Sequence, residues 1–411
     1  MRFEGFGSAG NPIIIGLEVK LLNAEYRAYL ENGVDRTGTH CLKWDDRKNT
    51  FGREDVLPMW VADMDFPTLP AICQALAKRT EHPVFGYTFV TPEEKRAELG
   101  WLERRHGVKA ELDWILYCDG VVDSLFACAR AFARPGSQIM VQPPVYGPFY
   151  QAAKVNGFGL WRNGLRQTED GWHMDLENME QGFRSGVSMF LLCNPHNPVG
   201  RVWTREELLQ VTELADRYGV TIVSDEIHSD FIYAPHRLNS ILSLPHPERR
   251  IMLHSVTKTF NLAALRQSSL LAPGEEKRAL IRTELEKMHA GTPNLFGALA
   301  QRVAYEQGDE WLDELLRYLQ ENRDWLKDAL SRRLPQIRMS DLEGTYLAWL
   351  DFRAFQLDQE TLSEKLIRET GLGLSSGLQF GEEGNGFFRM NLATQRKNVE
   401  EAVDRLAKTF G

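Results

Sequence analysis

The sequence predicts an α/β protein in which a doubly wound, mainly parallel sheet forms a large domain and a smaller domain is α+β. Three observations predict this arrangement. Between about Trp114 and Ser255, short β-rich runs alternate with helical patterns, the order expected for a parallel sheet with helices on both faces. After Leu295 the pattern changes to long amphipathic helices followed by separated strands. The chain of 411 residues also exceeds one ordinary domain of roughly 100–200 residues.

The predicted elements follow from these patterns. The expected strands of the sheet are Ile115–Cys118, Gln138–Gln142, Ser188–Cys193, Val220–Ser224 and Ile251–Ser255. The expected helices between them include Val122–Ala133, Tyr146–Asn156 and Arg205–Tyr218. In the C-terminal part we expect helices at Leu295–Glu306, Asp309–Arg333 and Gln359–Thr370, and strands at Tyr346–Asp351 and Phe387–Leu392.

We divide the chain into an extension and two domains. Residues 1–25 start with a stretch rich in Gly, Ser and Asn and are expected to form an N-terminal extension outside the fold. Residues 81–299 would form the large domain, and residues 26–80 and 300–411 would together form the small domain.

Composition and charge exclude several classes of protein. Hydrophobic residues make up 43% and charged residues 26% of the chain, values typical of a folded protein. A net charge of −9 argues against nucleic acid or anionic lipid as a partner. The five scattered cysteines fit neither a disulfide framework nor a zinc site, and indicate a reducing cytoplasm. We expect neither a membrane span nor a signal peptide, because apolar runs are short.

Chemically informative residues follow five of the expected strands. Ligands of open α/β sheets bind beyond the carboxyl ends of the strands, so these positions are candidates for a site. The segments are Asp119–Ser124, Pro143–Tyr146, Cys193–Gly200, Ser224–His228 and Ser255–Asn261. Each has an ordinary structural alternative, such as a β–α turn, a core tyrosine, a helix-capping aspartate or a surface lysine. Their succession at five strand ends favours one shared site.

Individual residues in these segments suit particular chemistry. The Gly-containing turn before Val121 leads into a helix whose free N–H groups can hold a phosphate. Asn197 lies in a loop with two Asn-Pro steps, which favour extended backbone and can aim an amide at a ligand. Asp225 ends a buried strand, where an acid needs a positive partner. Cys193 and His196 lack a second pair at zinc spacing, so we expect no metal.

These segments resemble fold-type I enzymes that depend on pyridoxal 5'-phosphate (PLP), and the resemblance covers the chain from about Asn32 onward. It is carried by the N-P-x-N-P-x-G loop around Asn197, by S-D-E-I-H with Asp225, and by S-x-[ST]-K-[ST]-F-N with Lys258. Further strings resemble the cysteine-S-conjugate β-lyase branch, which includes cystathionine β-lyases. They are Gly38–His40, Leu42–Asp45, Met59–Phe66 and Gly344–Asp351.

The resemblance implies roles for residues around the cofactor. Lys258 would form the Schiff base with PLP and act as the base at the substrate Cα. Asp225 would keep the pyridine nitrogen protonated. Tyr146 would stack on the ring, and Asn197 would donate to the phenolic oxygen. His228 stands where many aminotransferases carry a tyrosine to that oxygen, a substitution typical of the lyase branch.

The resemblance also implies a phosphate site and a substrate site. The phosphate would be held by the amides of Val121 and Val122, the hydroxyls of Ser255 and Thr257, Arg266, and Tyr87 of a neighbouring subunit. Arg266 departs from the lyase branch, which often has Gln there. Arg389 would bind the substrate carboxylate as a bidentate fork, with Asn197, Trp60 and Tyr346 on the substrate side. A role for Tyr87 implies a homodimer with shared active sites.

The expected activity is that of a carbon–sulfur β-lyase, which eliminates a thiol from cysteine S-conjugates such as cystathionine and leaves pyruvate and ammonia. The neighbourhoods of Trp60 and Tyr346, together with His228, favour this reaction. An aminotransferase is the first alternative, because it uses the same carbanion. A regulatory protein built on the same fold is the second, but the intact cofactor-binding residues argue against it as a sole function. The sequence does not predict the physiological substrate.

Overall fold

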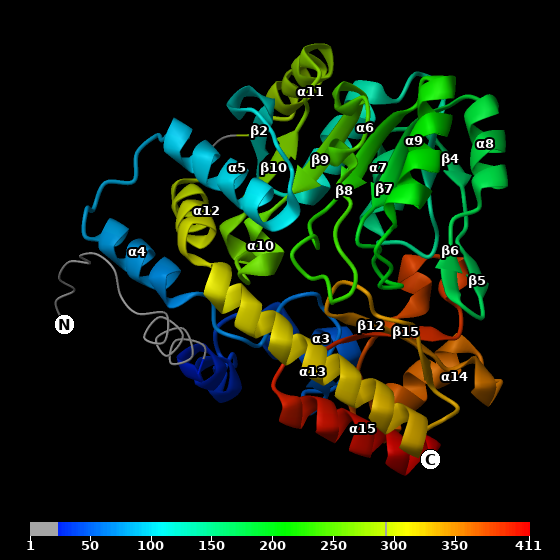
Figure 1. The fold of residues 1–411 in the computed structure, drawn as a ribbon. Coiled ribbons are helices and arrows are strands. Elements are labelled where there is room, and N and C mark those ends of the chain that lie inside the picture. The colour runs from blue at the N-terminus through cyan, green and yellow to red at the C-terminus, as the bar shows by residue number, and fades with distance from the viewer. Residues whose placement is uncertain (1–23, 292–293) are drawn as a thin grey trace, which may run out of the picture.

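The computed structural model describes residues 24–291 and 294–411, and a seven-stranded sheet lies in its larger part (Figure 1). From one edge to the other its strands are β2 (Ile115–Cys118), β10 (Ser268–Leu271), β9 (Arg250–His254), β8 (Thr221–Asp225), β7 (Val187–Cys193), β3 (Gln138–Val141) and β4 (Gly159–Arg162). β10 is antiparallel to both neighbours, and the other adjacent pairs are parallel. All strands except β10 therefore have their carboxyl ends at the same edge.

Helices cover both faces of this sheet because its strands are apolar on both sides. In β7, Met189 and Leu191 belong to one core cluster, whereas Phe190 and Leu192 belong to another. The first cluster includes residues of α6 (Val121–Phe132), α7 (Pro148–Val155) and α11 (Glu275–Lys287). The second includes residues of α5 (Pro92–His106), α8 (Leu176–Arg184) and α9 (Arg205–Tyr218). This is the doubly wound arrangement predicted from the sequence.

Local signals set the limits of α9. Its N-cap Thr204 accepts a hydrogen bond from the backbone of Glu207, and the Glu207 carboxylate accepts one from the backbone of Thr204. Gly219 follows the last turn with φ of 68°, a conformation that glycine adopts without steric cost. The expected helix and its capping box are confirmed.

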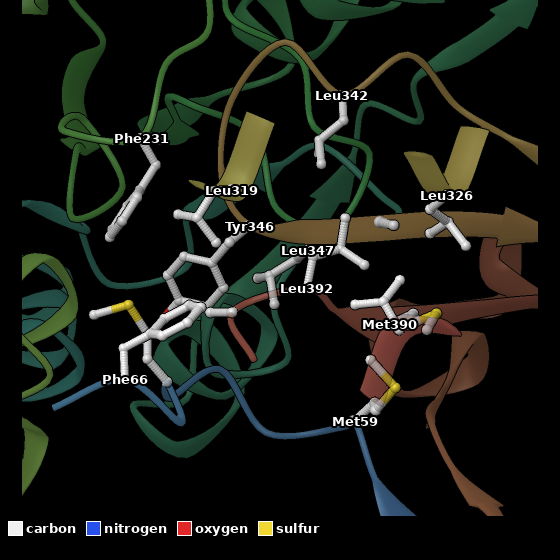
Figure 2. Close-up of a cluster of buried hydrophobic side chains, with 14 of the residues drawn as sticks. Met59, Phe66, Phe231, Leu319, Leu326, Leu342, Tyr346, Leu347, Met390 and Leu392 are labelled. Atoms are coloured by element: carbon white, nitrogen blue, oxygen red, sulfur yellow. The ribbon is translucent and has the colours of Figure 1, made fainter. Parts of the chain in front are cut away.

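The smaller part of the molecule contains a four-stranded antiparallel sheet and long helices. The order of its strands is β11 (Arg338–Met339), β12 (Leu347–Asp351), β15 (Phe387–Asn391) and β14 (Ser375–Ser376). The helices are α13 (Asp309–Arg333), α14 (Gln359–Glu364) and α15 (Arg396–Phe410). Leu326 of α13, Leu347 of β12 and Met390 of β15 belong to one apolar cluster (Figure 2).

Segments from the first quarter of the chain join this smaller part. They comprise a helix within 24–32, α2 (Leu42–Asp45), α3 (Arg47–Phe51), β1 (Leu57–Pro58) and α4 (Pro70–Thr80). β1 pairs in parallel with β13 (Leu372–Gly373). α12 (Leu295–Gln307) packs on both α4 and α5, and a hairpin of β5 (Arg166–Thr168) and β6 (Gly171–His173) extends from the large sheet. The proposed domain limits stay a prediction.

Several limits differ from those expected from the sequence. The helix expected from Tyr146 begins only at Pro148, because two prolines and a glycine precede its first turn. The helix expected over Gln359–Thr370 changes to a π-helical turn at Lys365–Glu369. β4 and β10 were not predicted, since β10 carries two serines that the structure buries.

Residues 1–23 of the expected extension lie outside the described part. No helix described by the structure is long and apolar enough to cross a bilayer.

The core around α13 gives a first prediction. We expect Leu326→Ala to lower the free energy of unfolding by about 2–5 kcal/mol, because it removes a fully buried side chain from the cluster of Figure 2. Urea denaturation followed by fluorescence would measure the change. Leu357→Ala is the matched control, since Leu357 is 38% exposed and its truncation should cost less than about 1 kcal/mol. Equal losses in the two variants would contradict this description of the core.

Candidate active site

Three residues predicted for the site lie at neighbouring strand ends of the large sheet. Asp225 is the last residue of β8, and Lys258 lies in the short helix α10 (Val256–Thr259) directly after β9. Asn197 lies in the loop after β7. The β7–β8 register aligns Cys193 with Asp225, so the loop that carries Asn197 starts beside the aspartate. The sheet topology therefore brings together residues far apart in sequence, as expected from their positions after strands.

Gly200 closes the loop after β7 at a position where a side chain would not fit. Its φ of 81° is left-handed, and a Cβ atom there would lie 2.6 Å from Cδ1 of Leu342. The amides of Glu343 and Gly344 both donate to the carbonyl oxygen of Gly200. Glycine at this position therefore lets the loop of Asn197 pack against the strand connection that leads to Tyr346.

The amine of Lys258 is held by a backbone carbonyl. Nζ donates to the oxygen of Ala62 at 2.5 Å. Burial lowers the pKa of Lys258 to about 8, and the positive charge of Arg389 acts in the same direction. A lysine with this pKa is partly neutral near physiological pH, which suits a nucleophile or a base.

Asp225 and His228 lie in the same buried segment, and burial shifts their pKa values in opposite directions. Burial raises the pKa of Asp225 to about 7, and the amide of Ile227 donates to its carboxylate at 3.1 Å. Burial lowers the pKa of His228 to about 3, helped by the charges of Lys258 and Arg389. His228 is therefore neutral at physiological pH, and its ring lies edge-on to that of Tyr346 at 5.9 Å.

Arg389 of β15 is a buried cation fixed from several sides. Nη1 donates to Oδ1 of Asn197 at 3.0 Å, and Nη2 donates to the carbonyl oxygen of Trp60 at 2.9 Å. The guanidinium lies over the ring of Phe380, 4.7 Å from its centroid. Burial lowers the pKa of Arg389 to about 10, so it stays charged at neutral pH. The arrangement is that of a rigid binding group for an anion.

The segment Met59–Phe66 supplies carbonyl oxygens to the site. Ala62 accepts from Tyr346 Oη at 3.1 Å as well as from Lys258. Two asparagines hold the segment: Asn391 Nδ2 donates to the carbonyls of Val61 and Asp63 at 2.6 Å, and Asn261 Nδ2 donates to that of Met64 at 2.8 Å.

The roles of Ala62, Asn261 and Asn391 were not predicted. The two asparagines end the strings F-R-M-N and K-T-F-N, so their position is visible in the sequence. The backbone acceptor at Ala62 has no such signal, because any residue offers a carbonyl oxygen.

The residues expected to hold a phosphate lie around the start of α6. That helix begins at Val121, so the amides of Val121 and Val122 belong to a first turn without intrahelical partners. Ser255 Oγ and Thr257 Oγ1 lie 2.6 Å apart. Arg266 is exposed and pairs with Asp123 of the same helix turn at 3.3 Å. The structure thus brings these five residues to one corner of the sheet, where Arg266 is held by an acid.

The two predicted tyrosines differ in placement. Tyr146 is 38% exposed. Burial of its hydroxyl end raises its pKa; nearby Arg389 lowers it and nearby Asp225 raises it. Tyr87 is fully exposed. Its neighbours Val84, Phe85 and Phe89 are exposed as well.

The site fits PLP by the chemistry of its buried polar atoms. Among the described residues, Nδ1 of His228, Nε of Arg389 and Nε1 of Trp60 are buried without a hydrogen-bond partner. A phenolic oxygen and a carboxylate would satisfy such groups. The Asp225 carboxylate likewise needs a cation, which a protonated pyridine nitrogen would supply.

The buried carboxylate of Asp225 gives a prediction for the apoprotein. Its pKa is about 7 in the folded chain against an ordinary 3.8. As the pH rises between these two values, the carboxyl group ionises in the unfolded state but not in the folded state, so the free energy of unfolding falls. We expect the melting temperature of Asp225→Asn to exceed that of the wild type by an amount that grows from pH about 4 to about 7 and then stays constant. For each pH unit in this window, the difference in the free energy of unfolding between the two proteins should grow by about 1.4 kcal/mol.

Melting curves of both apoproteins across this pH range would test the expectation. Asp404→Asn is the control, because Asp404 is 65% exposed and its substitution should have a small effect at every pH. A constant difference between Asp225→Asn and the wild type would contradict the interpretation of a buried carboxyl group.

Comparisons with known proteins agree with this geometry. The family described as aminotransferase class I and II matches residues 54–406. Cystathionine beta-lyase PatB of Bacillus subtilis is 38% identical over 375 residues, which cover 90% of this chain and 97% of the relative.

Two solved structures share the fold over nearly their whole length. A PLP-bound putative aminotransferase from Clostridium difficile has a TM-score of 0.91 at 35% identity, and the match covers 93% of this chain and 99% of that one. Cystalysin from Treponema denticola, whose structure contains a pyridoxal 5'-phosphate cofactor, has a TM-score of 0.88 at 30% identity, with 92% and 97% covered. The family match spans most of the chain and the fold agrees throughout, so the protein belongs to the aminotransferase class I and II family.

Proposed function

We propose that the protein is a PLP-dependent carbon–sulfur β-lyase that cleaves the Cβ–S bond of cysteine thioethers such as cystathionine. The products would be pyruvate, ammonia and a thiol. The observation that carries the proposal is the 38% identity to a cystathionine beta-lyase over 97% of that relative's length. The site supports it, because Lys258 and the buried Asp225 at strand ends of the large sheet lie near the buried Arg389 of β15.

Three parts of the protein would hold the cofactor. When bound, PLP supplies an electron sink that stabilises negative charge at the substrate Cα. The carboxylate of Asp225 would pair with the pyridine nitrogen, which offsets the cost of burying its charge. His228 and Asn197 would face the phenolic oxygen, and the first turn of α6 would hold the phosphate.

Lys258 would anchor the cofactor and then take the proton from Cα. Its pKa of about 8 leaves part of the amine neutral, so Nζ can accept that proton. In this structure the carbonyl of Ala62 accepts from Nζ, and it also accepts from the hydroxyl of Tyr346. Both groups would therefore stand on the side of the substrate from which the proton leaves.

Arg389 would bind the substrate carboxylate and orient the Cα–H bond. Asn197 and the carbonyl of Trp60 hold its two terminal nitrogens, while its Nε–H keeps no partner among the described residues. A planar fork with fixed orientation can bind a carboxylate through two hydrogen bonds. The carbonyl of Trp60 bonds to Arg389 and Tyr346 lies near it, so both residues would flank the bound substrate.

An aminotransferase is the alternative supported by a specific observation. The exposed Arg266 near the phosphate corner is the residue more usual in that branch, and one of the similar solved structures is described as a putative aminotransferase. Removal of the Cα proton by Lys258 is common to both reactions. They differ in whether a group leaves from Cβ or the proton returns at another carbon.

We also propose that the enzyme works as a homodimer in the cytoplasm. The exposed apolar segment with Val84, Phe85, Tyr87 and Phe89 supports an interface between copies, because such patches are uncommon on monomers. Tyr87 would then reach the phosphate bound by the partner. The five described cysteines are all free, which fits a reducing compartment.

The products from a thioether separate the lyase from the aminotransferase. With cystathionine and PLP-loaded protein, we expect pyruvate, ammonia and thiol in equal amounts without an added keto acid, because loss of the thiolate leaves the enzyme ready for another turnover. Alanine has no leaving group and should give no continuous turnover without a keto acid. Lys258→Ala is the negative control for both. Thioether turnover that requires a keto acid and releases no thiol would replace the lyase by the aminotransferase.

Shared active sites predict complementation between inactive subunits. Tyr87→Phe subunits keep Lys258, and Lys258→Ala subunits keep Tyr87, so a hybrid dimer would contain one complete site. Random mixing after denaturation and refolding should give about a quarter of wild-type activity, since half of the dimers are hybrids with one site of two. Each variant refolded alone should stay below that level. Full activity in a protein shown to be monomeric by light scattering would refute the proposal.

A further inference from the structure

Asp230 is a buried carboxylate outside the site described above, and it accepts three hydrogen bonds. Trp101 Nε1 donates at 3.1 Å, His106 Nε2 lies at 2.7 Å, and Thr259 Oγ1 donates at 2.6 Å. Burial is the largest single influence and would raise the pKa of Asp230, but the hydrogen bonds from His106 and Thr259 and the charges of His106 and His254 together lower the pKa to about 2. The carboxylate is therefore a permanent, strong acceptor at physiological pH.

The third donor links Asp230 to the proposed Schiff-base lysine. Thr259 directly follows Lys258 in α10, a helix of only four residues. So short a helix has little stability of its own, and its orientation depends on contacts at its ends. Ser255 accepts from the amide of Thr257 at the start of α10, and Asp230 accepts from Thr259 at its end.

Asp230 is itself fixed relative to the cofactor-binding residues. It lies five positions after Asp225 and two after His228 in the same segment, and two residues of α5 donate to it. A short segment and one hydrogen bond therefore connect the residue proposed to hold the pyridine nitrogen with the helix that carries Lys258.

His106, Asp230 and His254 also lie within 4.8 Å of one another, a spacing that can hold a metal ion. Two ligand atoms around a tetrahedral zinc lie about 3.3 Å apart, which follows from bond lengths near 2.0 Å. The 2.7 Å between His106 and Asp230 is shorter and is that of a direct hydrogen bond. Asp230 also already accepts from two further donors, so the group is better described as a hydrogen-bonded anchor.

We propose that Asp230 is a positioning residue for Lys258, and that it acts through the hydroxyl of Thr259 to fix the direction in which the lysine leaves α10. This inference rests on the role of Lys258 in the proposed function. The hydrogen bonds of Asp230 are to Trp101, His106 and Thr259, none of which is proposed to hold the cofactor or the substrate. Its effect should therefore appear in the covalent attachment of the cofactor more than in the rest of the binding site.

Two cofactor analogues separate positioning from general damage to the fold. PLP can form a covalent bond with Lys258, whereas 4'-deoxypyridoxine 5'-phosphate lacks the aldehyde and binds only through the remaining contacts. Tryptophan fluorescence of the apoprotein gives both dissociation constants. We expect Thr259→Val to weaken binding of PLP by about tenfold and to leave binding of the analogue within about twofold, because a charged hydrogen bond is lost only next to Lys258. In catalysis, kcat should fall with little change in KM.

Matched variants make the test specific. Thr259→Ser keeps the hydroxyl and should restore PLP binding to nearly the wild-type value. Thr283→Val is the control for the substitution itself, since Thr283 is exposed and its Oγ1 donates to the carbonyl of Ala279 within its own helix. If Thr259→Val proves unstable, Asp230→Asn keeps the shape but removes the charge, and should act in the same direction.

The outcomes test the role of Asp230 separately from the role of Lys258. If Thr259→Val and Asp230→Asn weaken PLP and the analogue equally, or leave both unchanged, Asp230 does not position Lys258. If Lys258→Ala still binds PLP more tightly than the analogue by the wild-type ratio, the assignment of Lys258 fails. Loss of the selective effect on PLP in Lys258→Ala, together with its reduction in Thr259→Val and recovery in Thr259→Ser, would support the inference.

Discussion

The carbonyl oxygen of Ala62 accepts hydrogen bonds from both Lys258 and Tyr346, and the geometry of the site depends on it. Lys258 follows a strand of the large sheet, whereas Tyr346 precedes a strand of the smaller one. The segment that carries Ala62 belongs to the N-terminal part of the chain and is held by Asn391 and Asn261. Three distant parts of the sequence must therefore fold together before the amine has a defined position.

Burying a charged side chain costs free energy, and Arg389, Asp225 and Asp230 differ in the contacts that offset this cost. Arg389 keeps its charge because three oxygen acceptors, from Asn197, Trp60 and Ser375, and the face of Phe380 surround the guanidinium. Asp225 has only the amide of Ile227, so burial raises its pKa to about 7 and favours the neutral form until a cation arrives. Asp230 is equally buried but ionised, because His106 and two further donors satisfy it. Hydrogen bonds and the charges of nearby histidines together keep Asp230 ionised, whereas the favourable contacts of Asp225 do not offset its burial.

Sequence periodicity predicted most of the central sheet, because strands buried on both faces are continuous apolar runs such as Met189–Cys193. β10 was not predicted, because Ser268 and Ser269 are polar residues, which are not typical of a buried strand. Their hydroxyls are satisfied inside the protein, since Ser268 donates to the carbonyl of Cys118 and Ser269 to Glu98. Residues at the strand ends could be predicted, because topology gathers them at one edge. The acceptor at Ala62 and the anchor at Asp230 could not, because both depend on tertiary contacts rather than on residue type.

The site also concentrates positive charge in a protein whose net charge is −9. Burial is the main cause of the lowered pKa of Lys258, and repulsion from Arg389 adds to it, whereas Asp63 and Asp225 act in the opposite direction. Such repulsion costs stability in the free protein, and an anionic ligand relieves it. The carboxylate of an amino-acid substrate would bring negative charge to this place. Anion binding at the site therefore does not require a basic surface, because the attraction arises from two cations that the fold forces together away from water.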